Sequence, residues 1–285
     1  MHQGGVKVFI GLGGNFLAAT PDTNYTSEAL QRCQLTVQIS TKLNRAHLIT
    51  GERALILPCL GRTERDFQKS GEQFVSVEDT TGVVHMSRGV LQPASEHLLS
   101  EPAIIADIAR ATLQEQTTVD WERLIENYDC IREHIEHVVP DFTQYNIRVR
   151  QPGGFYLPND PHQGKFNTPT KRAKFSVHKI PEHDLPKGGL LLTTIRSHDQ
   201  FNTTIYSEND RYRGISNGRR VVFLNNEDIS RLGLKKDQWV DLVSHFESEL
   251  RRAERFKVVP YEIPPGCAAA YYPETNVLVP IRSVG

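Results

Sequence analysis

Polar side chains gather directly after a short apolar stretch in the second half of the chain. Residues 190–195 read LLLTTI, and a short apolar run with β-branched residues and no helical spacing favours a buried strand. A guanidinium fork matches phosphate geometry, and amides match the edges of heterocycles. The sequence therefore predicts a loop that binds a polar ligand, and a loop that satisfies only itself and water is the alternative. The hydrogen-bonding residues of this loop are Arg196, Ser197, His198, Asp199, Gln200, Asn202, Thr203 and Thr204.

A second candidate site follows a strand near the N-terminus. Residues 6–10, VKVFI, run straight into a stretch that contains Gly13, Gly14 and Asn15. Open α/β sheets present such glycine-rich turns to phosphates, because the absence of Cβ atoms lets backbone N–H groups approach the ligand. The stretch does not match G-x-G-x-x-G cleanly, and no acidic residue stands where a ribose-binding one is expected. A tight turn without a ligand therefore remains the other interpretation.

Two further strands are expected close behind the first. Residues 35–39, LTVQI, contain Gln38 and end at Ser40 and Thr41, and residues 54–57 are ALIL. The carboxyl ends of parallel strands meet at one edge of a sheet, which is where such sheets bind ligands. These strands are too few to cover a sheet, so the sequence predicts a partial doubly wound domain whose first strand belongs to the middle of a domain.

The middle of the chain is predicted to be a hairpin followed by helices. Residues 73–77 and 82–85 alternate around a turn signal, which is typical of a β-hairpin. Ser100, with an acid and a proline behind it, is a helix start. Asp120 is predicted to cap one longer helix that continues to Pro140. His134 and His137 on this helix lie among charges, so a solvated helix flank is a better interpretation than a metal site.

The remainder of the chain is predicted to be a linker and a β-barrel. Residues 140–189 are rich in proline, glycine and polar residues, which indicates a long connection with one strand at 173–177. Short strands with prolines at their ends and one small helix at residues 226–233 then indicate a compact β-barrel. The strands expected in this barrel after the strand at residues 190–195 are residues 219–224, 239–243, 257–261, 267–272 and 277–281.

Composition narrows the classes of partner. The net charge is −1 and the sequence pI is about 6.8, so bulk electrostatics do not favour nucleic acid. The apolar runs are too short to cross a bilayer, so no membrane partner and a cytoplasmic location are expected. The four cysteines form no Cys-x-x-Cys pair, which argues against a zinc site, an iron–sulfur cluster or a disulfide framework within this chain.

Several motifs, taken in order, resemble one enzyme family. The run RSHDQFNTT from Arg196, the later VPYEIPPG and YYPETN, and the order of strands resemble the C-terminal dinucleotide-binding domain of molybdopterin oxidoreductases. The first half, through IGLGGNFLAATPD, LTVQISTKLNR, ALILPCLGRTERD and SRGVLQPAS, is similar to the preceding α/β domain of these enzymes. The resemblance is to the formate dehydrogenase-like branch of the dimethyl sulfoxide reductase superfamily, and it covers nearly the whole chain.

The resemblance implies a fold, a cofactor and a set of contacts. It implies a partial α/β domain at 1–145, a linker at 146–188 and a double-psi β-barrel at 189–285. The implied cofactor is bis(molybdopterin guanine dinucleotide) with molybdenum. Many relatives have an aspartate where this chain has Ile39. The residues that the resemblance implies as cofactor contacts are Gly13, Gly14, Asn15, Gln38, Ser40, Thr41, Asn44, Arg196, Ser197, Gln200, Asn202, Thr203, Tyr272 and Asn276.

The resemblance also implies a part that this chain does not contain. Enzymes of the family are longer, and their 4Fe-4S-binding cysteines and any molybdenum ligand lie in the N-terminal part. No residue of this chain is named as a molybdenum ligand or a catalytic base. The implied activity is that of a molybdopterin-dependent oxidoreductase acting on a small substrate such as formate, when joined to the N-terminal part. The alternative is a non-catalytic binding module or a truncated remnant without activity.

Overall fold

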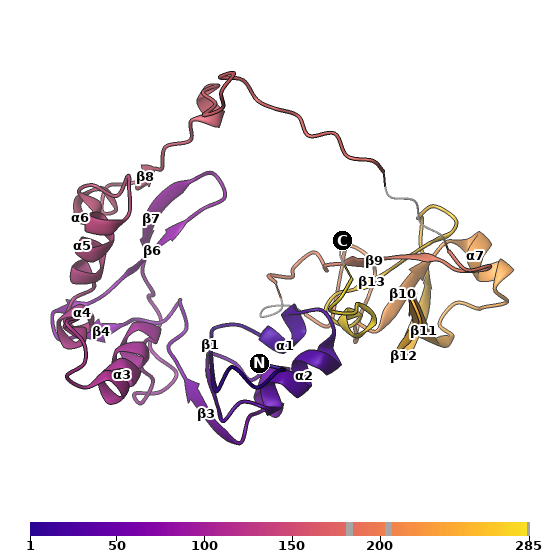
Figure 1. The fold of residues 1–285 in the computed structure, drawn as a ribbon, viewed down its shortest axis with the longest axis horizontal. Helices are drawn as coiled ribbons and strands as arrows, with labels where there is room; N and C mark the ends of the chain where they lie inside the picture. Colours follow the sequence, from indigo (N-terminus) through magenta and orange to yellow (C-terminus); the bar gives the residue numbers. More distant parts are fainter. Residues whose placement is uncertain (181–184, 203–206, 284–285) are drawn as a thin grey trace. The chain divides into compact units, whose positions relative to one another are not determined.

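The chain forms two compact units in the computed structural model (Figure 1). Met1–Leu57 and Ile180–Gly285 make up the first, called unit 1, and Pro58–Lys179 make up the second, called unit 2. The chain therefore leaves unit 1 and returns to it. The structure describes residues 1–180, 185–202 and 207–283.

The compact units do not coincide with the predicted domains. The predicted α/β domain at 1–145 is divided between the two units, and its first 57 residues pack with the C-terminal part of the chain. The predicted linker at 146–188 includes the place where the chain re-enters unit 1. The boundaries at 145 and 188 stay predictions about domains of the family, whereas the units describe which residues contact one another.

The N-terminal part of unit 1 is a small sheet with helices on the connection between its strands. Strand β1 pairs with β2 in parallel, with Gly11 opposite Gln38, and β3 lies on the other side of β2. The parallel order confirms the expected α/β arrangement. The elements are β1 (Val8–Leu12), α1 (Phe16–Ala19), α2 (Thr23–Gln31), β2 (Leu35–Ser40), the 3-10 helix η1 (Arg45–Leu48) and β3 (Arg53–Pro58).

These helices pack on one face of the sheet through apolar side chains. Leu17, Leu30 and Ala46 form a buried cluster against which Phe9 and Phe16 pack, with the two phenylalanine rings 5.0 Å apart between centroids. Phe9 faces the helices, so its neighbours Val8 and Ile10 face the other side of the sheet, because side chains alternate along a strand.

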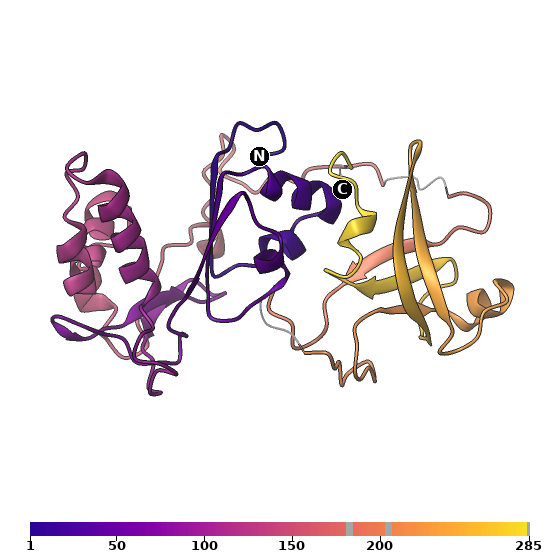
Figure 2. The same cartoon turned by 90° about the horizontal axis from the view of Figure 1, so that it is seen from below.

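The C-terminal part of unit 1 is a curled, mixed sheet of five strands in the order β11-β12-β10-β13-β9. Figure 2 shows β11 and β12 as a long twisted hairpin beside the shorter strands. The two parts together confirm a mixed α/β fold, and the curled sheet is consistent with the predicted β-barrel. The elements are β9 (Leu191–Ile195), β10 (Val221–Leu224), α7 (Asn226–Arg231), β11 (Trp239–Phe246), β12 (Glu249–Pro260), β13 (Cys267–Tyr271) and the 3-10 helix η3 (Asn276–Leu278).

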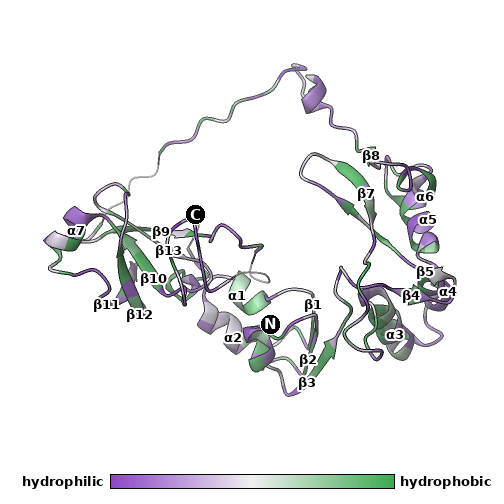
Figure 3. Ribbon diagram, turned by 180° about the vertical axis from the view of Figure 1, so that it is seen from behind, coloured by the Kyte–Doolittle hydropathy of each residue, from purple (hydrophilic) through white to green (hydrophobic). Residues whose placement is uncertain are grey.

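Buried residues of the central strands hold this sheet together. Val222, Phe256, Val258 and Ala270 belong to one buried cluster, and β10 is correspondingly hydrophobic in Figure 3. All four residues of β10 are buried. Burying such side chains stabilises a fold by about 1.5–3 kcal/mol each for the larger ones. The strand predicted at 219–224 is thus the centre of the sheet.

Residues 277–281 do not form the strand that was predicted. Leu278 N–H bonds to Thr275 O at 2.9 Å and Val279 N–H bonds to Asn276 O at 3.2 Å. These local bonds produce the turn of η3, and the N–H groups they use are not available for a ladder. The apolar run is explained by burial of Leu278 in the sheet's core rather than by strand pairing.

Unit 2 combines short sheets with helices. The predicted hairpin is confirmed as β6 and β7, which pair antiparallel, and the predicted cap is confirmed because the Ser100 hydroxyl accepts a bond from Ala103 N–H. The elements are β4 (Phe67–Gln68), β5 (Gly71–Glu72), β6 (Val75–Glu78), β7 (Val83–Ser87), α3 (Glu101–Leu113), α4 (Trp121–Glu126), α5 (Tyr128–Val138), α6 (Tyr145–Arg148), β8 (Phe155–Tyr156) and the 3-10 helix η2 (Pro161–Gln163).

The single helix predicted from Asp120 to Pro140 is wrong, because the chain breaks at Asn127. Asn127 is extended, with φ −150° and ψ 115°, and its side chain accepts from Asp129 N–H to cap α5. The backbone groups freed at the break have other partners: Glu126 O accepts from Ser70 N–H, and Tyr128 N–H donates to the Gln73 side chain at 2.9 Å. Asparagine is among the best N-caps, so it ends one helix and begins another.

Residues 173–177 do not form the predicted strand. Phe175 and Val177 are 91% and 95% exposed, and no strand pairs with them among the described residues. Alternation of apolar and polar residues produces a strand only where a neighbouring edge supplies hydrogen bonds. The segment therefore has the pattern of a strand without the partner that a strand needs.

Candidate cofactor site

The carboxyl edge of β1 and β2 places a buried amide beside a glycine. Gln38 is 2% exposed, and a Cβ at Gly11 would lie only 2.6 Å from Gln38 Oε1. Glycine at position 11 is what lets the Gln38 side chain lie across β1. Gln38 Nε2 is buried and has no hydrogen-bond partner among the described residues. A buried donor without an acceptor costs about 1–3 kcal/mol, so this amide is well suited to a ligand oxygen.

The predicted glycine turn is tied to the end of β2. Gly13 N–H donates to Ile39 O at 2.8 Å, with Gly13 at φ 67°, a left-handed conformation that favours glycine. Asn44 Nδ2 donates to Gly14 O at 3.2 Å. The structure thus brings Gly13, Gly14 and Asn44 together at one edge. The remaining predicted residues of this half, Asn15, Ser40 and Thr41, belong to the same turns at the ends of β1 and β2.

His47 is a member of this edge that the sequence did not predict. Asn44 Oδ1 accepts from Ala46 N–H at 2.9 Å, and Asn44 N–H donates to His47 Nδ1, also at 2.9 Å. Because Nδ1 accepts, the proton of the neutral ring lies on Nε2. That nitrogen is buried without a partner among the residues described. The histidine therefore fixes the turn around Asn44 and holds a second donor in a buried position.

The loop after β9 is organised around Arg219, which the sequence did not predict either. Arg219 is 4% exposed; it donates to Ser197 Oγ at 2.7 Å, to Gln200 Oε1 at 2.7 Å and to Tyr272 O at 3.2 Å. Gln200 Nε2 in turn donates to Asn202 O at 2.6 Å. The side chains of Ser197 and Gln200 thus already have partners within the protein.

Arg219 also forms an ion pair with a buried acid. Arg219 Nε lies 2.9 Å from Glu274 Oε1, and the two side chains are only 3% and 16% exposed. Burial raises the pKa of Glu274 above its ordinary value, although the charge and the hydrogen bond of Arg219 oppose this. Through Arg219, the loop, Tyr272 and Glu274 form one connected network.

Arg196 is exposed, whereas Ser197 is buried and Gln200 is half-buried. Its guanidinium carbon lies 5.8 Å from the centroid of the Tyr272 ring, and it makes no ion pair with the described residues. Its backbone carbonyl accepts from Arg213 at 3.1 Å, which fixes the backbone while the guanidinium faces solvent. Arg196 and Tyr272 could therefore hold an anionic group with an aromatic part. Thr203, also predicted as a contact, lies outside the described residues.

Residues 272–276 connect the loop with the α/β part of unit 1. Tyr272 N–H bonds to Ile195 O at 2.9 Å, and Asn276 Nδ2 donates to Ala18 O at 2.6 Å. Asn276 is 5% exposed, and its carbonyl accepts from Asp22 N–H at 3.0 Å. The structure thus uses Asn276 to join the two parts, and its predicted role as a cofactor contact stays a prediction.

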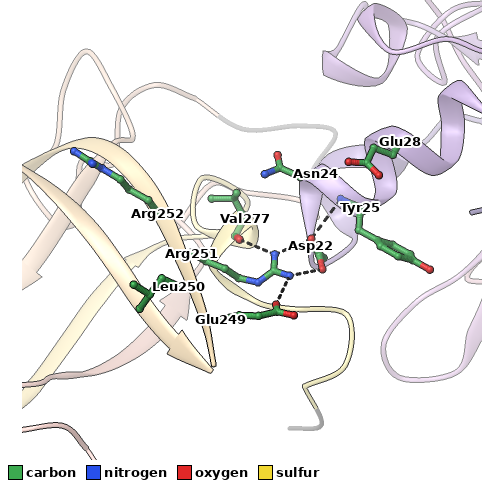
Figure 4. Close-up of a pocket in the computed structure, with 9 residues that line it drawn as sticks. All are labelled: Asp22, Asn24, Tyr25, Glu28, Glu249, Leu250, Arg251, Arg252 and Val277. Atoms are coloured by element: carbon green, nitrogen blue, oxygen red, sulfur yellow. Dashed lines mark hydrogen bonds and ion pairs between the residues drawn. The ribbon is translucent and has the colours of Figure 1, made fainter. Parts of the chain in front are cut away.

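A pocket of about 630 Å³ lies next to this junction, between α2 and the β11–β12 hairpin (Figure 4). None of the residues predicted as cofactor contacts lines it. Arg251 crosses its floor and donates to both oxygens of Asp22 at 2.8 Å, and to Glu249 at 3.2 Å. Because acids already surround this arginine, the pocket is a structural junction rather than an anion site.

The Asp22 carboxylate is held ionised at this junction. Burial disfavours its charge, but hydrogen bonds from Arg251 and from the backbone N–H groups of Ile281 and Tyr25 outweigh burial and lower the pKa of Asp22. Asp22 also caps α2 by accepting from Tyr25 N–H. One carboxylate thus connects a helix start, the hairpin and the C-terminal turn.

The described residues contain neither a metal-binding cluster nor a membrane-spanning helix. No group of three or more His, Cys, Asp or Glu side chains is arranged to hold a metal ion in the described part of the chain. Within residues 1–180, 185–202 and 207–283, helices are too short or too polar to cross a membrane.

Comparison with known proteins identifies the C-terminal region. Residues 190–283 match the family described as the molydopterin dinucleotide binding domain. An uncharacterized oxidoreductase of Mycobacterium tuberculosis is 52% identical over 287 residues, which is 99% of this chain and 37% of the relative. Protein YdeP of Escherichia coli is 43% identical over 280 residues, 96% of this chain and 37% of that protein. The chain thus spans little more than a third of the length of these curated relatives.

A solved structure has a similar fold. The acetylene hydratase of Pelobacter acetylenicus superposes with a TM-score of 0.61 at 17% identity, over 93% of this chain and 37% of the hydratase. The fold similarity extends across both units, whereas the family match lies in unit 1 and contains the Arg196 loop, Arg219 and Tyr272. Residues 190–283 therefore carry the molydopterin dinucleotide binding domain, and over nearly all of its length the chain is similar to a portion of proteins named as oxidoreductases.

Proposed function

We propose that this chain binds the nucleotide arms of bis(molybdopterin guanine dinucleotide) in a molybdenum-dependent oxidoreductase of the formate dehydrogenase-like branch. The observation that carries the proposal is the buried Nε2 of Gln38, which has no partner in the described part of the chain. It lies at the carboxyl edge of a parallel strand pair, in the same compact unit as the molydopterin dinucleotide binding domain. Parallel sheets bind nucleotides at this edge.

The residues present fit such a cofactor in their chemistry. The backbone of Gly13 and Gly14 suits phosphate oxygens, and the Gln38 amide suits an acceptor on a guanine or ribose. Arg196 provides a guanidinium for a phosphate or pterin oxygen, and Tyr272 provides a ring for stacking. When bound, the cofactor supplies the electron-transfer chemistry, and this chain binds and orients it.

The finer features of the family complete the proposal. The curled sheet is proposed to be a double-psi β-barrel, and the α/β part a portion of a doubly wound domain. Formate, or a similar small molecule, is the proposed substrate, and any 4Fe-4S cluster and the molybdenum ligand are assigned to the part of the enzyme outside this chain. A cytoplasmic location is proposed with them.

The alternative of a non-catalytic module or remnant is favoured by one specific observation. Ser197 and Gln200, two of the predicted contacts, are bonded to Arg219 at 2.7 Å each. A loop that satisfies its own polar groups in this way needs no ligand to be stable. If this alternative holds, Arg196 has no partner to bind and its replacement changes only the surface charge.

Co-expression with the remaining part of the enzyme tests the proposal. The part of the Mycobacterium tuberculosis oxidoreductase that this chain does not match is expressed with it, and guanine nucleotide released on denaturation is quantified with molybdenum. Guanine nucleotide is expected in the complex. Arg196→Ala is expected to lower occupancy through loss of a charge-assisted bond of about 1.5–3 kcal/mol.

The matched control is Arg110→Ala in unit 2. Arg110 is about half exposed, and its ion pair with Asp107 is 3.4 Å long within one helix, so its replacement changes charge without touching unit 1. Equal nucleotide content in the two variants would show that the Arg196 loop does not bind the cofactor. Complete absence of nucleotide from the wild-type complex would favour the module or remnant.

A further inference from the structure

Strand β1 is an edge strand of its sheet, and in the described part of the chain its outer edge has none of the usual protecting features. In the three-stranded sheet β1 is the neighbour of β2 alone, and none of the described residues pairs with its other side. The strand sequence is VFIGL, which contains neither a charged residue nor a proline. Natural sheets protect open edges with lysines, prolines, bulges or very short strands. None of these devices is present between Val8 and Leu12.

The hydrogen-bond register shows which groups point to the open side. Leu35 N–H donates to Lys7 O, and Gly13 N–H donates to Ile39 O, so the odd-numbered residues bond to β2. In a parallel strand the N–H and C=O of alternate residues point to opposite neighbours. The backbone groups of Val8, Ile10 and Leu12 therefore point outward from the sheet.

The same residues also present apolar side chains. Val8, Ile10 and Leu12 are 49%, 46% and 48% exposed, whereas their register partners on β2 include Val37 at 3% and Ile39 at 0%. Parallel sheets are normally buried on both faces, and apolar area brings about 25 cal/mol of stabilisation for each Å² buried. Among the described residues, the backbone groups of Val8, Ile10 and Leu12 thus lack partners at the edge of the sheet, and their side chains are only partly covered on the face away from the helices.

We infer that β1 is an internal strand of a larger sheet, and that its open edge binds an apolar, parallel strand from the part of the oxidoreductase outside this chain. This inference rests on the proposed function, because it takes the rest of the enzyme as the occupant. The mycobacterial relatives match 99% of this chain, and the match accounts for 37% of their length, so most of their length is available to supply the strand. A second copy of this chain is the competing occupant.

Docking at this edge would also complete the proposed cofactor site. The connection from β1 to β2 places α1 and α2 on one face, where Phe9 packs. A strand added beside β1 would be connected through a helix on the opposite face of the sheet. The connections on the two sides of β1 would then run in opposite directions, so the carboxyl end of β1 would be a point where the strand order reverses. Ligands bind in open α/β sheets at such points, and Gly13 and Gly14 stand there.

Amide hydrogen exchange on the co-expressed complex gives the first test. The amides of Val8, Ile10 and Leu12 are expected to exchange fast in the isolated chain and at least about tenfold more slowly in the complex, because pairing adds hydrogen bonds to these groups. The amides of Phe9 and Gly11 bond to β2 in both states and change less. Fast exchange of Ile10 and Leu12 in an intact complex would overturn the inference.

Ile10→Lys gives the second test, with Val243→Lys as control. Val243 is 51% exposed on β11, a strand at the edge of the other sheet of unit 1. Ile10→Lys is expected to weaken binding of the remaining enzyme part at least about tenfold, the factor that 1.4 kcal/mol produces, and Val243→Lys to leave it unchanged. Both variants should melt near the wild type, because both positions are half exposed.

The outcomes separate this inference from the proposed function. If the complex forms equally well with Ile10→Lys, the edge is not the docking surface, whatever the nucleotide content. If the complex depends on Ile10 but contains no guanine nucleotide, the docking surface stands and the cofactor proposal fails. If the isolated chain dimerises through protected β1 amides and the remaining part does not bind, the occupant is a second copy and the inference is wrong.

Discussion

Replacement of Arg219 by alanine should destabilise unit 1 strongly, because it leaves a buried acid without its counter-charge. The ion pair with Glu274 is 2.9 Å long between side chains that are 3% and 16% exposed. Removing one partner of a buried pair costs about 3–5 kcal/mol. The lost bonds to Ser197 and Gln200 loosen the loop as well, so the cost should fall in the upper part of this range.

The penalty of Arg219→Ala should depend on pH in a defined direction. Burial raises the pKa of Glu274 above its ordinary value, and loss of the arginine raises it further. A carboxyl group with a raised folded pKa destabilises the fold progressively as the pH rises above its unfolded pKa. The variant should therefore lose less stability at pH 5, where Glu274 can take up a proton, than at pH 8.

Urea unfolding measures both effects. Trp239 lies in β11 of unit 1 and Trp121 in α4 of unit 2, so a Trp121→Phe background lets tryptophan fluorescence report on unit 1. The matched variants are Glu274→Gln and Arg219→Ala/Glu274→Gln, and the double variant should recover part of the loss. The reasoning is refuted if Arg219→Ala costs under about 1 kcal/mol, or if the cost is the same at both pH values and in both backgrounds.

Two further predictions concern the α/β part of unit 1. Gly11→Ala should cost about 1–3 kcal/mol and reduce guanine nucleotide in the complex, since the new Cβ would stand 2.6 Å from Gln38 Oε1; unchanged unfolding and nucleotide content would contradict the role given to this glycine. Asp22→Asn should cost about 3–5 kcal/mol at pH 7, through loss of the pair with Arg251. Because the pKa of Asp22 is lowered below 3.8, its stabilising effect is present above that value and disappears as the pH falls through the folded pKa. Urea midpoints of the two proteins should therefore converge below pH 3.8, and parallel pH profiles would exclude this explanation.

Much of the local structure could be predicted because its causes are local. The strands after residues 5 and 34 are short apolar runs, and Ser100 caps α3 with a hydroxyl that its own sequence neighbourhood provides. The first half of β12, before residue 257, could not be predicted because its local sequence lacks an apolar run. Its sequence, ELRRAERF, is charged at most positions, because the hairpin exposes most of these side chains and only Ala253 and Phe256 are buried.

The failures at Asn127 and at residues 173–177 show where local pattern is insufficient. Periodicity could not reveal the break at Asn127, because the freed groups bond to Ser70 and Gln73, which are more than fifty residues away in sequence. Residues 173–177 alternate between apolar and polar side chains as a strand does, but a strand also needs a neighbouring strand with which to form hydrogen bonds. Both errors come from hydrogen-bond partners that are distant in sequence.

The candidate site illustrates the same division between composition and arrangement. Composition predicted a cluster of donors after Ile195, and it did not distinguish Arg196, Ser197 and Gln200 as possible ligand contacts. The structure separates them, because Arg219 uses Ser197 and Gln200 as acceptors and leaves the guanidinium of Arg196 exposed. Ser197 and Gln200 thus shape the loop, whereas Arg196 is available to a ligand. Arg219 lies 22 residues from Ser197 and 55 from Glu274, so its role depends on how β9, β10 and β13 are ordered in the sheet, and a sequence pattern does not contain that order.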